Sequence, residues 1–147
     1  MRFLITAGVD PNAPKSENAE SNVPMDDALI AAYMKHNEEM HKAGVLVTAE
    51  GLSPAGGRAR VVAAGGKRTV TDGPFTETKE LLGGFYLIDV KSKEEAIEWA
   101  LRCPVTLGFD DVLEIYQLTD LSEIPPEMVE ICKRAAPTWT ASVMKPR

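Results

Sequence analysis

The segment FYLIDVKSKEEAIEWAL, residues 85–101, decides the fold class because a strand pattern changes to a helix pattern within it. Its first six residues form an apolar stretch of strand length. Ser92 and Glu95 then form a capping box, in which the serine oxygen and the glutamate satisfy the first free amides of a helix. The helix must end before Pro104, since proline disfavours helical backbone in the preceding residue. The segment therefore predicts a strand followed directly by a short helix.

The same two patterns recur on both sides of this segment. A longer helix is predicted over residues 25–43, with acidic residues in its first turn and Gly44 as its stop. Gly65 and Gly66 predict a tight hairpin turn. Further strands are predicted at residues 2–9, 45–49, 58–64, 67–71 and 111–118, and a short helix at 127–136. This order predicts an α+β fold, a ferredoxin-like split βαβ sandwich with two helices against one antiparallel sheet.

Two helices cover only one face of such a sheet. The other face is apolar at alternate positions and needs a cover, because apolar surface of that extent is unfavourable in water. A symmetric dimer supplies the cover economically, since each copy hides the same face of the other. The sequence therefore predicts a homodimer.

Composition and charge exclude several classes of function. The chain has 147 residues, a net charge of −6 and 44% hydrophobic residues, which is ordinary for a globular domain that forms its own core. The negative charge and the absence of a basic run disfavour nucleic acid as a partner. No stretch approaches the roughly 20 apolar residues of a membrane span. Cys103 and Cys132 lie in no metal or disulfide spacing, so a cytoplasmic protein with reduced thiols is expected.

The most specific motif is VTDGPFTETKE, residues 70–80. Asp72 can accept hydrogen bonds from amides two residues on, the following glycine allows positive φ, and the proline fixes the exit of the turn. Phe75 is expected to anchor the loop to the core. The motif thus predicts a rigid corner that presents Asp72, Glu77 and Lys79 near a sheet edge.

This motif, followed by the strand GFYLI at residues 84–88, resembles the DGPF group of YCII-related domain proteins. The segments HNEEM at 36–40, AEGL at 49–52 and KSKEEAIEWA at 91–100 support the resemblance. The resemblance implies a dimeric α/β barrel built from two ferredoxin-like halves. The family is mostly uncharacterised. Its wider superfamily includes small-molecule enzymes, among them a dehydrochlorinase, and proteins that accompany or are fused to extracytoplasmic-function sigma factors.

Residues 1–118 carry the resemblance and are predicted to form one domain. Residues 119–147 form a C-terminal extension beyond it. Met128, Val129 and Ile131 predict a weakly amphipathic helix in this extension. We expect it to pack on the dimer partner.

The resemblance implies a catalytic pair of a histidine from the first helix and an aspartate, for which this chain offers His36 and Asp72. His36 lies with Tyr33 and Met40 on the helix stripe that is expected to face the sheet. A part-buried imidazole can act as base or acid near neutral pH, and a carboxylate can orient it. The alternatives are a hydrogen-bonded core histidine and a turn-capping aspartate.

A substrate cavity is predicted between the first helix and the sheet. Its expected lining residues are Tyr33, Met40, Glu50, Phe75 and Lys79. For Glu50 a surface ion pair with Arg58 or Arg60 is the alternative. No metal or cofactor is predicted: His36 and His41 stand about 140° apart round a helix, and no cofactor motif occurs.

Three functions fit these observations. The first is a cofactor-free small-molecule enzyme in which His36 moves a proton with Asp72 nearby. The second is a non-catalytic ligand-binding or regulatory module linked to sigma-factor-type transcription control. The third is a structural dimer whose cavity is filled by its own side chains. The sequence does not decide between them, and it identifies neither the ligand nor the reaction.

Overall fold

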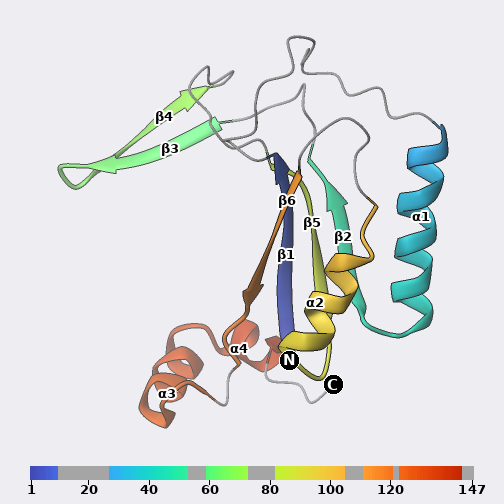
Figure 1. The fold of residues 1–147 in the computed structure, drawn as a ribbon. Coiled ribbons are helices and arrows are strands. Elements are labelled where there is room, and N and C mark those ends of the chain that lie inside the picture. The colour runs from blue at the N-terminus through green and yellow to red at the C-terminus, as the bar shows by residue number, and fades with distance from the viewer. Residues whose placement is uncertain (10–26, 53–58, 73–81, 105–110, 121–122, 144–147) are drawn as a thin grey trace.

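The computed structural model describes residues 1–9, 27–52, 59–72, 82–104, 111–120 and 123–143 (Figure 1). Strands and helices follow one another in the predicted order, and α4 adds a helix that the sequence did not predict. No helix within these ranges is long and apolar enough to cross a membrane. The elements are β1 (Arg2–Val9), α1 (Asp27–Lys42), β2 (Leu46–Gly51), β3 (Ala59–Ala64), β4 (Lys67–Asp72), β5 (Leu82–Asp89), α2 (Lys93–Leu101), β6 (Asp111–Gln117), α3 (Pro126–Ala135) and α4 (Pro137–Val143).

A four-stranded antiparallel sheet with the strand order β2-β5-β1-β6 forms the centre of the fold. The strand β1 pairs with β5 on one side and with β6 on the other. One helix follows β1 and a second follows β5, so the order is that of a ferredoxin-like α+β fold. This confirms the predicted fold class.

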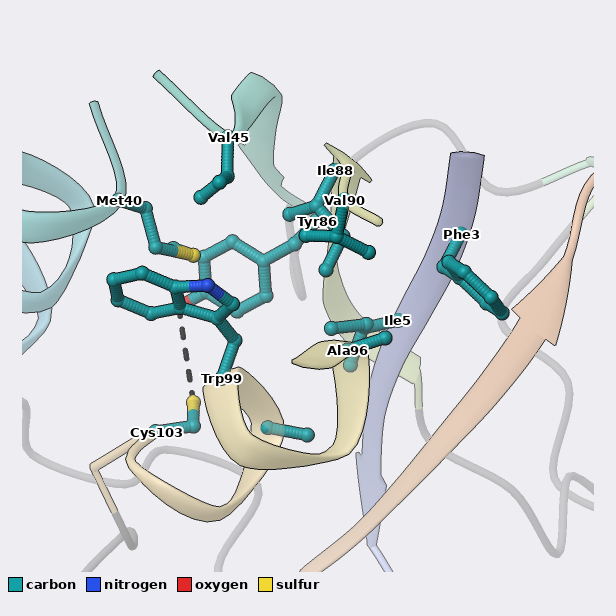
Figure 2. Close-up of a cluster of buried hydrophobic side chains, with 11 residues drawn as sticks. Phe3, Ile5, Met40, Val45, Tyr86, Ile88, Val90, Ala96, Trp99 and Cys103 are labelled. Atoms are coloured by element: carbon teal, nitrogen blue, oxygen red, sulfur yellow. Dashed lines mark hydrogen bonds between the residues drawn. The ribbon is translucent and has the colours of Figure 1, made fainter. Parts of the chain in front are cut away.

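The core lies between the sheet and the helices α1 and α2 (Figure 2). Phe3 and Ile5 of β1 and Ile88 of β5 are almost completely buried. In the same cluster they are joined by Met40 of α1 and Trp99 of α2. Successive residues of a strand point to opposite faces, so the residues between these core positions point to the side without α1 and α2.

That second side of the sheet is called the open face below. Leu4 pairs across the strands with Leu87 and Tyr116, which makes one apolar row. Tyr116 remains 49% exposed, and Val112 on the same strand face remains 38% exposed. The open face includes Leu4 and Thr6 of β1, Thr48 and Glu50 of β2, Phe85 and Leu87 of β5, and Val112, Glu114 and Tyr116 of β6. A contiguous apolar strip of this kind marks an interaction surface.

The strands β3 and β4 form a two-stranded sheet of their own, whereas the sequence predicted a single sheet. The reason is that β2 and β5 pair directly with each other, which leaves no place between them for the inserted hairpin. Gly65 and Gly66 close the hairpin with φ values of 58° and 77°, as a tight hairpin turn requires. Figure 1 shows the hairpin projecting away from the four-stranded sheet.

The start of α2 follows the predicted cap. The Oγ of Ser92 accepts a hydrogen bond from the amide of Glu95 at 3.2 Å. The Glu95 carboxylate accepts from the amide of Lys91 at 2.8 Å, one residue earlier than in a standard capping box. The cap fixes where α2 begins and thereby places Trp99 over the sheet.

Candidate functional site

His36 lies in the middle of α1 on the side that faces the sheet. Leu29, His36 and Met40 are the buried residues of this helix, and their spacing places them on one side. Tyr33 packs partly buried against the same core, whereas His41 is exposed. The predicted helix stripe therefore faces the core, and it brings Tyr33, His36 and Met40 together.

Aromatic rings surround the imidazole, which is 4% exposed. The ring of Tyr86 meets it edge-on, with the centroids 5.8 Å apart and an interplanar angle of 87°. The ring of Trp99 lies 6.1 Å away at 57°. The thiol of Cys103 makes a long hydrogen bond of 3.9 Å to the hydroxyl of Tyr86, drawn as the dashed line in Figure 2. These four residues are called the His36 cluster.

An ion pair borders the His36 cluster on its solvent side. The guanidinium of Arg102 donates to the carboxylate of Glu39 at 2.5 Å, and both side chains are about half exposed. The Cζ of Arg102 also lies 4.2 Å from the centre of the Trp99 ring, which is cation–π geometry. The pair thus ties α1 to the end of α2 directly beside the imidazole.

Burial fixes the protonation states of the cluster near neutral pH. The pKa of His36 is lowered from its ordinary value, chiefly because burial penalises the charged imidazolium, and further by the positive charge of Arg102. The negative charge of Glu39 opposes this shift in part. Burial, reinforced by Cys103, raises the pKa of Tyr86. A neutral imidazole, able to accept a proton, therefore lies beside a protonated phenol.

The next residue of α1, Asn37, has an unusual environment. Its Oδ1 is buried and has no hydrogen-bond partner within the described part of the chain. Leaving a polar atom buried without a partner costs about 1–3 kcal/mol. A hydrogen-bond donor on a bound molecule would remove this cost.

The other predicted site residues are distributed differently. Glu50 pairs with Phe85 on the open face, opposite to His36, and is exposed, with the hydroxyl of Thr48 donating to its carboxylate at 3.1 Å. The backbone of Asp72 ends β4 in the separate hairpin, while its side chain is outside the described structure. Phe75 and Lys79 also lie outside the described residues.

Sequence reasoning did not identify most of the neighbours of His36. Tyr86 was one residue of an apolar strand, and Trp99 was expected only to pack. Their rings reach the imidazole because β5 lies next to β1 under both helices, which is a tertiary effect. Glu39 had a local signal, since it lies three residues after His36 and therefore on a neighbouring part of the helix surface.

No group of three or more histidine, cysteine, aspartate or glutamate side chains in the described ranges is placed to hold a metal ion. Cys103 is buried and Cys132 is half-buried, and the structure shows no disulfide bond at either of these two residues.

We expect the protein to lose stability as the pH falls below about 6.5, the ordinary pKa of histidine. The pKa of His36 is lowered in the folded state, so in the window beneath 6.5 the unfolded chain binds more protons than the folded chain. The contribution of neutral His36 to the free energy of unfolding is complete above this pH window and is lost as the pH falls through it. Urea unfolding at several pH values measures the effect. His36→Phe should reduce the slope of stability against pH, and a slope equal to that of wild type would contradict the assignment. The exposed residue His41 supplies the control, His41→Phe.

The fold and the site define a class: a ferredoxin-like α+β protein with a histidine of its first helix buried against the sheet. The model of the YCII-related domain family matches residues 1–122, so the chain belongs to the YCII-related domain family. An uncharacterized protein of Rhizobium meliloti (strain 1021) is 46% identical over 87 residues, which cover 51% of this chain and 70% of that protein. The helices α3 and α4 lie beyond the matched residues.

Proposed function

We propose that this chain forms a cytoplasmic homodimer that binds a small organic molecule beside α1, with His36 as the group that accepts a proton from it. The observation that carries the proposal is a neutral imidazole held among aromatic rings. The following residue of α1, Asn37, adds a buried Oδ1 that has no hydrogen-bond partner among the described residues. Polar groups with perturbed pKa values in an apolar setting are typical of functional sites.

The chemistry follows from the protonation states. His36 can accept a proton in its neutral form, and the Tyr86 hydroxyl is a hydrogen-bond donor. The charge of the Glu39 carboxylate, which is paired with Arg102, favours the protonated form of His36 and so supports proton uptake. The orienting role stays with Asp72 as a prediction. This assignment requires no cofactor, because proton transfer between an imidazole and an organic acid needs none.

The exposed apolar surface supports the dimer. In a single copy the open face leaves Val112 and Tyr116 partly in water, and two such faces placed together would cover both. The helix α3 packs on α4, where the hydroxyl of Thr140 donates to the carbonyl of Cys132, but it keeps an exposed apolar side. Within the described residues α3 has no buried residue, and Met128 and Ile131 are each 53% exposed. We assign this extension to the dimer partner, with Trp139 as its anchor.

One observation favours the second candidate function, a non-catalytic ligand-binding or regulatory module of the sigma-factor type. His36 is 4% exposed, so a ligand can reach it only if the packing around the imidazole changes. A protein that changes shape when it binds a ligand is suited to signalling. The two candidates share the binding site and differ in whether the ligand reacts.

NMR titration in D₂O with a set of aromatic and aliphatic carboxylic acids tests the proposal. We expect at least one compound to shift the His36 ring resonance, and His36→Phe to weaken its binding about tenfold or more through the lost hydrogen bond. The matched control His41→Phe should bind like wild type. Exchange of ligand C–H protons for deuterium would indicate catalysis, whereas binding without exchange would favour the module. The proposal is wrong if every compound leaves the His36 resonance unchanged.

A further inference from the structure

The hairpin β3–β4 has no cover within the described part of the protein. Every described side chain from Ala59 to Val70 is exposed, and the two strands pair only with each other. Figure 1 shows the hairpin and α3 on the side of the sheet away from α1. A two-stranded hairpin alone is at best marginally stable in water. The two strands nevertheless pair regularly and are joined by a tight glycine turn. A hairpin of this regularity therefore suggests that another surface packs against it.

One face of the hairpin is apolar at its centre. Val61 pairs directly with Val70, and these residues are 54% and 67% exposed. Ala59 and Ala63 lie on the same face, two residues to either side of Val61, and Arg68, the cross-strand partner of Ala63, shares this face near the tip. Burial on a partner surface would stabilise this exposed valine pair, because apolar side chains are removed from water.

The hairpin is also basic, in contrast to the rest of the chain. Residues 59–72 contain the basic residues Arg60, Lys67 and Arg68 and one acidic residue, Asp72. The whole chain carries −6 and these residues contribute +2, so the remainder carries −8. Lys67 and Arg68 stand exposed directly after the turn, at the tip of the hairpin.

The open face has the complementary pattern. Its apolar strip of Leu4, Phe85 and Leu87 is bordered by exposed carboxylates, Glu114 on β6 and Glu50 on β2. An apolar strip with acidic borders fits an apolar ribbon with a basic tip. Both surfaces belong to the same chain, so two copies related by a twofold axis can each offer one to the other.

We propose that the hairpin β3–β4 is an intersubunit arm: its Val61–Val70 face, which includes Arg68, packs on the rim of the open face of a second copy. There the basic tip lies beside an acidic edge of that sheet, at Glu50 of β2 or at Glu114 of β6. This inference rests on the homodimer proposed above and adds the segment that holds it together. Opposite charges at such a contact also speed association and fix its register.

Charge reversal at the tip tests the arm, with sedimentation equilibrium giving the dimer dissociation constant. We expect Lys67→Glu with Arg68→Glu to raise this constant at least tenfold, because attraction becomes repulsion at both symmetric contacts. Adding Glu50→Lys and Glu114→Lys to the same chain should restore it towards the wild-type value. Lys35→Glu with Lys93→Glu makes the same change in net charge on exposed helix positions and should have little effect.

A second variant examines the apolar contact. Val61→Thr with Val70→Thr keeps β-branched side chains in the ribbon and removes apolar surface, so it should weaken the dimer about tenfold or more. A wild-type dimer that neither set of arm variants affects would overturn the arm and leave the homodimer standing. Weakening that the added lysines do not reverse would overturn the pairing with Glu50 or Glu114. A monomeric wild-type protein would overturn both the homodimer and the arm.

Discussion

Leu87→Glu should yield a folded monomer. Leu87 lies on β5 in the middle of the open face, where it pairs with Leu4 of β1 and Thr48 of β2. In a single copy a glutamate there can reach water, so the fold is retained. In the dimer two such carboxylates would be buried without partners, which costs several kcal/mol for each. The dimer dissociation constant should rise about a thousandfold or more, as measured by sedimentation equilibrium.

Leu101→Glu is the matched control. Leu101 ends α2 and is 80% exposed, and the same change there should leave the association unchanged. A persistent Leu87→Glu dimer would show that the copies associate through another surface. The same measurement on Trp139→Ser tests the C-terminal extension. We expect this substitution to raise the dimer dissociation constant, because the extension is proposed to contribute to the contact between subunits. An unchanged dissociation constant would contradict that contribution.

Ile88→Ala should affect the fold instead of the association, although Ile88 is the next residue along β5. Its side chain is fully buried beneath the helices and belongs to the core cluster with Phe3 and Trp99. Truncating a buried isoleucine to alanine lowers the free energy of unfolding by about 2–5 kcal/mol, because apolar contacts are lost and a cavity remains.

Urea unfolding at one fixed protein concentration measures this cost, since the stability of a dimer depends on concentration. Leu101→Ala serves as the exposed control and should stay within about 0.5 kcal/mol of wild type. A change below about 1 kcal/mol for Ile88→Ala would contradict the assignment of this face of β5 to the core.

Local signals in the sequence predicted most of the fold. The strand β1 has the bounds that its apolar pattern and the following Asp10-Pro11 predict, and the cap at Ser92 places the start of α2. These features depend on residues close together in the chain. The separation of β3 and β4 from the main sheet has no such local cause, because it depends on the pairing of β2 with β5, which is distant in the chain. The sequence analysis predicted no helix after residue 136, whereas α4 begins at Pro137, and proline is favourable in a first helical turn.

The candidate site was predictable only along α1. A spacing of four and three residues on one helix placed Tyr33, His36 and Met40 on the core side, and the structure agrees. Tyr86 and Trp99 come from other elements, fifty and sixty-three residues away. No local pattern specifies such contacts, since they depend on how strands and helices pack. The pairing of His36 with Asp72 stays a prediction.

The position of β1 at the centre of the sheet has a consequence during synthesis. This strand is made before both of its neighbours, which begin at Leu82 and Asp111. Phe3 and Ile5 thus have no neighbouring strand to pair with until β5 has been made. Pairing between such distant segments is slow, and apolar residues that are not yet buried in a nascent chain are prone to aggregate. Of the four strands of this sheet, β1 therefore waits longest for its partners and gains most from a chaperone.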